Sequence, residues 1–138
     1  MKVGLDTSVV LRLLTGEPDD QAWVALRWLR EVQATGTTPV VSDLVVSEVY
    51  FALQHHFAVP KSEALRQLGE FLSSGDVTGT GVAGGVLAVP GLASAKPGFV
   101  DRLIHEGYRR GGAGEMVTFE EAARKLPHVR LLRVPGAA

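Results

Sequence analysis

The chain of 138 residues contains no cysteine, which excludes disulfide bonds and thiolate metal sites. This absence agrees with a reducing compartment, and we expect the protein to be cytoplasmic. An excess of one charge is also missing, because 14 Lys and Arg face 15 Asp and Glu for a formal net charge of −1. A protein that simply coats nucleic acid is more basic than this.

Long apolar runs are absent as well. The run Val86–Pro90 is too short to span a bilayer, so no contact with a membrane is expected. Asp6 interrupts the N-terminal apolar run, which argues against a signal peptide. With 46% hydrophobic and 21% charged residues, the composition is that of a soluble globular protein, and the length predicts a single domain over residues 1–138.

The charges are distributed unevenly along the chain. Residues 1–95 hold six Lys and Arg and ten Asp and Glu, whereas residues 96–138 hold eight and five. An acidic centre with a basic rim suits a nuclease. Ordinary scatter of surface charge gives the same counts, so this feature leaves both interpretations open.

Short apolar segments alternate with helical patterns over the whole chain. The predicted strands lie near residues 3–5, 39–41, 115–118 and 129–134, and the predicted helices cover 7–14, 18–34, 43–57, 61–72 and 99–110. This alternation predicts an α/β fold whose mostly parallel sheet is covered by helices on both faces. Seven glycines and two prolines in residues 73–98 leave two alternatives there: a strand at 76–78 with a poor helix at 82–89, or a mobile loop.

Asp6 follows the first predicted strand and precedes the first helix. In open parallel sheets, side chains at the carboxyl end of a strand are placed where ligands bind. The alternative is that Asp6 only caps the helix, as Asp often does.

Glu48 is predicted on the apolar side of helix 43–57. It lies roughly 130° from the centre of a polar stripe formed by other residues of the helix. A buried carboxylate must be paired, metal-bound or protonated. The alternative is a glutamate at the rim of the core that pairs with an arginine. The polar stripe comprises Asp43, Ser47, Tyr50 and Gln54.

Two further acidic positions lie at element ends. Asp101 is in the first turn of helix 99–110, where it either points into a cleft or only stabilises the helix dipole. Glu120 and Glu121 follow the strand at 115–118 and emerge near its carboxyl end if that strand is parallel. Either glutamate is otherwise a solvated residue of a first helical turn.

The acids are more informative together than singly. Oxygen ligands from several elements, without cysteine, suit Mg²⁺ or Mn²⁺. His55 and His56 are adjacent in sequence, so they do not form the i, i+4 pair of a zinc protease. A hard cation among carboxylates bridges to phosphate oxygens, which favours a metal-dependent phosphodiesterase.

Other residues have two interpretations each. His105, on the polar side of its helix, either touches a substrate or lies on the surface. Trp23 with Val24 either packs in the core or belongs to an exposed patch that binds a partner helix. Arginines near the last helix either guide phosphates or are only solvated; they are Arg102, Arg109 and Arg110.

Four segments resemble the ordered acidic motifs of PIN-domain ribonucleases. They are Asp6-Thr7-Ser8, Ser47-Glu48, Lys96-Pro97-Gly98-Phe99-Val100-Asp101-Arg102-Leu103-Ile104 and Val117-Thr118-Phe119-Glu120. The size and the VTFE…KLP ending are similar especially to the VapC toxins of bacterial toxin–antitoxin pairs. The resemblance covers nearly the whole chain.

The resemblance implies a three-layer α/β/α sandwich with a central sheet of four to five strands. It implies that Asp6, Glu48 and Asp101 line a pocket for Mg²⁺ or Mn²⁺ that hydrolyses RNA. It further implies a cognate antitoxin and a homodimer. Glu120 stands where the family usually has Asp, and its extra methylene moves the carboxylate outward by roughly one bond length, which favours contact through water.

The hypothesis that follows assigns a role to each residue. Asp6 and Asp101 hold the main ion, Glu48 is a ligand or orients water, and Glu120 completes the site through water. Three hydroxyls are predicted to hydrogen-bond the acids or the phosphate: Thr7, Ser8 and Thr118.

Two other function classes compete with this hypothesis. A haloacid-dehalogenase-like site needs a second Asp two residues after Asp6, but Ser8 is there, and the acidic pair and lysine of a receiver domain are not found at the expected places. A PIN-like module that binds a protein or RNA with little catalysis remains the main alternative.

Overall fold

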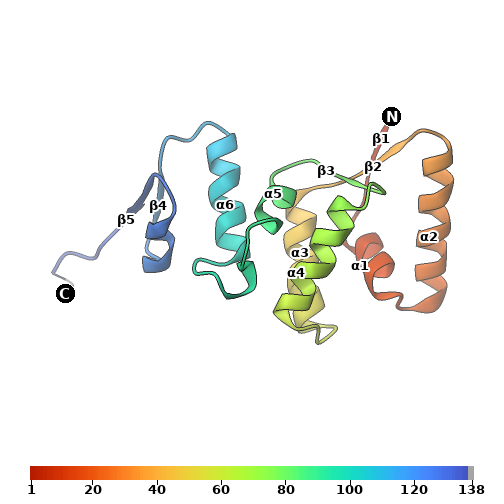
Figure 1. Ribbon diagram of the computed structural model, residues 1–138, viewed down its shortest axis with the longest axis horizontal. Helices are drawn as coiled ribbons and strands as arrows, with labels where there is room; N and C mark the ends of the chain where they lie inside the picture. Colours follow the sequence, from red (N-terminus) through yellow and green to blue (C-terminus); the bar gives the residue numbers. More distant parts are fainter. Residues whose placement is uncertain (137–138) are drawn as a thin grey trace.

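The computed structural model describes residues 1–136, so the last two residues of the expected domain lie outside the described part. The protein is an α/β protein, as predicted (Figure 1). In chain order its elements are β1 (Lys2–Gly4), α1 (Thr7–Thr15), α2 (Asp19–Ala34), β2 (Thr38–Val41), α3 (Asp43–His55), α4 (Lys61–Ser73), β3 (Thr78–Gly79), α5 (Ala83–Leu87), the 3-10 helix η1 (Leu92–Ser94), α6 (Phe99–Arg110), β4 (Met116–Thr118), the 3-10 helix η2 (Glu121–Lys125) and β5 (Val129–Leu131).

The strands of residues 1–136 form two parallel sheets instead of the single sheet of four to five strands that was expected. One sheet has the order β1-β2-β3, with Val3 opposite Pro39 and Val40 opposite Thr78. The other consists of β4 and β5. Figure 1 shows the small sheet of β4 and β5 at one end of the molecule, with α6 between it and the sheet of β1, β2 and β3. The parallel pairing is therefore confirmed, but the strands do not join.

Local sequence signals explain where the helices begin and end. The Ser42 hydroxyl caps α3 by accepting a hydrogen bond from the N–H of Val45 at 3.2 Å. Helix α1 ends at Gly16, which has a φ of 71°, a left-handed conformation that suits a residue without Cβ. Helix α2 begins directly after Pro18. The predicted bounds of these helices agree with the structure to within about two residues.

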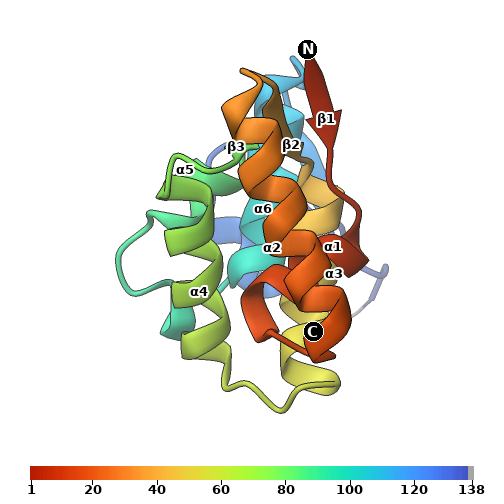
Figure 2. The same cartoon turned by 90° about the vertical axis from the view of Figure 1, so that its right-hand side faces the viewer.

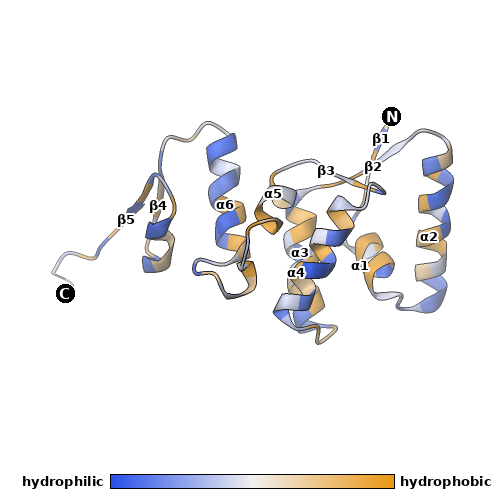
Figure 3. Ribbon diagram, viewed as in Figure 1, coloured by the Kyte–Doolittle hydropathy of each residue, from blue (hydrophilic) through white to orange (hydrophobic). Residues whose placement is uncertain are grey.

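Helix α3 lies at the centre of the core. Its Val49 and Leu53 have no exposed surface, and neither has Leu68 of α4. Helices α1 and α4 both pack against α3. In Figure 3, α1 is largely apolar whereas α2 and α6 carry many hydrophilic residues on the sides seen there. Among residues 1–136, no helix combines the length and the apolar character needed to cross a bilayer.

The glycine-rich segment is ordered by one carboxylate. Both oxygens of Asp43 accept backbone hydrogen bonds at the start of α5, from Val82 and Ala83 at 3.0 Å each. A Cβ on Gly81 would collide with this carboxylate. Glycine at position 81 therefore leaves room for this carboxylate, and the segment forms β3 and α5 rather than a loop.

This arrangement predicts a coupled effect on stability. Asp43→Ala should lower the free energy of unfolding by about 1 kcal/mol, because two backbone donors lose their acceptor. Gly81→Ala should cost a similar amount, since it displaces the same carboxylate. Urea unfolding of both variants and of the double variant measures this.

The coupling itself is the control. If the two substitutions act through one contact, the double variant is no less stable than the worse single variant. Additive losses would contradict this explanation.

Candidate functional site

Asp6 lies at the N-terminus of α1, one residue after the buried Leu5 that follows β1. It occupies the N-cap position, with φ −78° and ψ 162°, but its side chain makes no capping hydrogen bond. The carboxylate is exposed. The alternative in which Asp6 only caps the helix through its side chain is therefore wrong.

The hydroxyls proposed to support the site behave differently from one another. The Thr7 Oγ1 is buried and has no hydrogen-bond partner, alone among buried side-chain polar atoms of residues 1–136. Ser8 is exposed. The Thr118 Oγ1 accepts a hydrogen bond from the N–H of Glu120 at 3.0 Å, so it holds the turn after β4. Thr7 is the hydroxyl that still needs a partner.

Glu48 is exposed, so the prediction that it lies on a buried face of its helix is wrong. Its neighbours Leu44 and Phe51 are also exposed, by 70% and 46%. The predicted polar stripe turns inward instead: Asp43 binds α5, and Tyr50 is only 7% exposed. Apolarity gave the wrong face because no element of residues 1–136 covers Leu44, Glu48 and Phe51.

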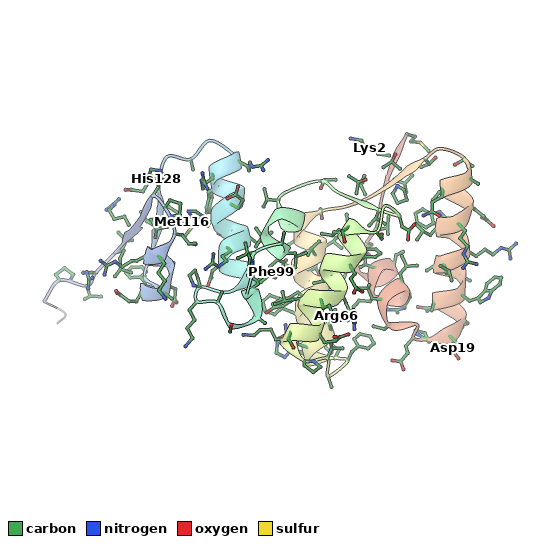
Figure 4. The ribbon with its side chains drawn as sticks, viewed as in Figure 1. Lys2, Asp19, Arg66, Phe99, Met116 and His128 are labelled. Atoms are coloured by element: carbon green, nitrogen blue, oxygen red, sulfur yellow. The ribbon has the colours of Figure 1, made fainter. Side chains whose placement is uncertain are left out.

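Asp101 lies in the first turn of α6 and is exposed. The turn is fixed by Phe99, whose ring packs edge-on against Tyr50 of α3 at 5.0 Å between centroids. Figure 4 labels Phe99 between α6 and the α3–α4 pair. Three predicted acids thus stand on elements connected through α3: Asp6 on α1, Glu48 on α3 and Asp101 on α6.

Glu120 lies elsewhere, after β4 in the small sheet, and is exposed. Its neighbour Glu121 forms an ion pair with Arg124 at 2.8 Å in η2. Glu121 is therefore a solvated glutamate at a helical start. Within residues 1–136, no three His, Asp or Glu side chains lie close enough to hold a metal ion. The four acids do not form one metal-binding group in this conformation.

The predicted acids nevertheless share one property. No hydrogen bond or ion pair within residues 1–136 engages the carboxylates of Asp6, Glu48, Asp101 or Glu120, whereas most other acids have a partner. Glu63 shows the contrast, because hydrogen bonds from Arg66 lower the pKa of its carboxyl from 4.5 to about 2. The donor set therefore fits Mg²⁺ or Mn²⁺ in its chemistry, although its present arrangement does not.

Residue His105 has a structural role that the sequence pattern missed. It is 5% exposed, the one buried polar residue that the structure shows within residues 1–136, and its Nε2 lies 2.7 Å from the carbonyl oxygen of Pro127. A carbonyl oxygen only accepts, so Nε2 carries the proton. This bond ties α6 to the turn before β5. The interpretation of His105 as a surface residue is wrong, and substrate contact stays a prediction.

His105→Ala should therefore loosen the small sheet from α6. Loss of the hydrogen bond removes about 1 kcal/mol, which should speed amide exchange in β4 and β5 about fivefold. Hydrogen–deuterium exchange with mass spectrometry measures this. Exchange in α3 should stay unchanged, and faster exchange there would mean that the core depends on His105.

Arginines near α6 are engaged in local contacts. Arg102 donates to the carbonyl of Pro97 at 2.7 Å, and Arg109 and Arg110 pair with Glu106 at 3.5 Å and 3.4 Å. These contacts stabilise α6 and its N-terminal turn. The phosphate-guiding role stays a prediction.

Three apolar residues of α2 are exposed: Trp23, Val24 and Leu26, by 62%, 64% and 41%. Trp23 and Leu26 lie together and form an apolar patch, whereas Val24 faces the space between α1 and α2. The guanidinium of Arg27 lies over the Trp23 ring at 5.4 Å from its centroid. The interpretation of Trp23 and Val24 as core residues is wrong, and a surface for a partner remains.

No protein-family model, curated protein or solved structure matches the chain. The function must therefore be inferred from the acids themselves: their order, their spacing and their carboxylates, which have no partner within residues 1–136.

Proposed function

We propose that the chain is a Mg²⁺- or Mn²⁺-dependent endoribonuclease of the PIN type and the toxin of a toxin–antitoxin pair. The observation that carries this proposal is that four acids, widely spaced in sequence, all leave their carboxylates free. Unpaired carboxylates are available to bind a hard cation. The free hydroxyl of Thr7 beside Asp6 supports the same position.

Each acid has a role in the proposed reaction. Asp6 and Asp101 would hold the ion, Glu48 would bind it or orient the attacking water, and Glu120 would act through water because of its longer side chain. When bound, the ion supplies charge neutralisation at the phosphate and activates water for attack. Thr7 and Ser8 hydrogen-bond the acids or the phosphate.

The proposal includes a closed α/β/α sandwich in which four to five strands share one sheet. The two parallel sheets with helices around them are compatible with such a sandwich. In this proposal the protein cleaves RNA in the cytoplasm, and a cognate antitoxin protein binds it. An apolar patch that contains Trp23 and Leu26 supports a protein partner on α2.

Asp6→Asn and Asp101→Asn should each lower metal-dependent RNA cleavage by about 100-fold or more, because each removes a charged ligand. Cleavage of a fluorescent single-stranded RNA with Mn²⁺ or Mg²⁺, and with EDTA as the blank, measures the loss.

Asp19→Asn is the matched control. Asp19 is also exposed and lies in the first turn of a helix, but it belongs to none of the acidic motifs. It should retain full activity. Full activity in Asp6→Asn, or equal losses in all three variants, would reject the assigned roles.

The alternative is a PIN-like module that binds RNA or protein without efficient catalysis. The observation in its favour is that the acids within residues 1–136 form no metal-binding group. Isothermal calorimetry with Mn²⁺ separates the two. The nuclease should bind Mn²⁺ saturably and lose this binding in Asp6→Asn, whereas absence of binding in the unmodified chain would favour the module.

A further inference from the structure

The sheet of β1, β2 and β3 has an open edge on β1. Within residues 1–136, strand β1 pairs with β2 alone, so no described strand lies beside the outer backbone groups of Lys2–Gly4. A strand edge of this kind is a template for another strand. Figure 2 shows β1 on one side of the molecule and α4 on the other, so α4 does not cover this edge.

Apolar surface surrounds the open edge. A hollow of about 530 Å³ lies beside β1, between α1 and α2, and Leu5, Val9, Val24 and Trp28 contribute to its lining. A strand added to β1 would direct alternate side chains toward this hollow. The edge therefore fits a strand that carries apolar residues on one face.

Strand β4 is such a strand. It has three residues, as β1 has, and in the described part of the chain it pairs with β5 alone. Val117 and Phe119 are two residues apart, and they are exposed by 48% and 69%. Side chains two apart in an extended segment share a face. The small sheet thus presents an uncovered apolar face and an open edge.

The strand of the same chain is held away from this edge. Figure 4 labels Lys2 on β1 and Met116 on β4, and the two lie far apart along the molecule with α6 and α3 between them. The five residues between α6 and β4 span at most about 17 Å. The His105–Pro127 hydrogen bond also ties the small sheet to α6, and closing within one chain would strain this tie.

The open strand of the small sheet favours a second copy as the occupant. β4 of a second copy brings a free strand edge and the exposed apolar pair Val117 and Phe119 to the edge of β1 and the hollow beside it. Because the same pair of surfaces is used twice, the contact closes with twofold symmetry.

We propose that two copies of this chain exchange their small sheets, so that β4 of each copy pairs in parallel with β1 of the other. The exchange joins five strands into one sheet on each side of the dimer. It also places the carboxyl end of β4, with Glu120, beside the carboxyl end of β1, with Asp6. The contribution of Glu120 to a shared site rests on the proposed function, whereas the strand pairing does not.

Cross-linking between chains tests the pairing directly. The chain contains no cysteine, so single cysteines react without background. Lys2→Cys and Met116→Cys place one thiol on each strand, about 5 Å apart in a paired sheet. A mixture of the two variants, co-expressed with different tags, should give a disulfide-linked heterodimer on non-reducing gels.

The control uses Ser62→Cys, at an exposed position of α4, in place of Lys2→Cys. Mixed with Met116→Cys, it should give no disulfide-linked heterodimer. A double variant with both Lys2→Cys and Met116→Cys in one chain distinguishes pairing between two chains from pairing within one chain. Linked dimers support the exchange, and a product of monomer size overturns it.

Light scattering after size exclusion tests the apolar face. Val117→Asp should convert the dimer into a monomer, because a charge would enter the hollow. Val134→Asp, at a valine that is 65% exposed and lies outside β4, should remain dimeric. A monomeric unmodified chain at micromolar concentration overturns the proposal, and so does a dimeric Val117→Asp.

Activity tests the shared site separately. Asp6→Asn and Glu120→Gln, each inactive alone, should together restore about one quarter of the unmodified activity, because half of the dimers are mixed and each has one intact site. No restoration in the presence of cross-linked dimers means that Glu120 is not shared. No activity in the unmodified chain rejects the nuclease and leaves the cross-link result standing.

Discussion

The edge-on contact between Phe99 and Tyr50 joins the last third of the chain to the core. It brings the start of α6 to α3, the helix that α1 and α4 also contact. Asp101 thus stands on an element that touches the helix of Glu48 through this ring pair and packs on α5. Beyond α6, β4 and β5 lie at the end of the molecule away from β1 (Figure 1).

The sheet and the helices explain why the acids are exposed. Asp6 follows β1, and the exposed side of α3 carries Glu48 between Leu44 and Phe51. Apolar side chains beside a free carboxylate mark a surface that another element covers. The open edge of β1, the hollow next to it and the face of β4 have the same character. The proposed exchange of β4 would cover the edge of β1 and the hollow, and it would also bring Glu120 next to Asp6.

The helices and strands were predictable because their signals are local. Ser42 as a cap, Gly16 as a stop and the period of apolar residues fix the bounds of α1, α3 and α6. The orientation of α3 was not predictable, since its inward face contains Asp43 and Tyr50. The carboxylate of Asp43 accepts its hydrogen bonds from a segment far along the chain, and the Tyr50 ring packs on Phe99 of α6. His105 was missed for the same reason: its partner is a carbonyl 22 residues away. The division into two sheets depends on long-range packing, which periodicity does not contain.

The bond between Asp43 and the start of α5 has a consequence for how this sequence can diverge. A side chain at position 81 would displace an acid at position 43, and α5 lacks an acceptor for its first amides when that acid is lost. The two positions, 38 residues apart, are thus expected to change jointly during evolution. A glycine that pairs with an aspartate in this manner would identify distant relatives even where the acidic motifs have drifted.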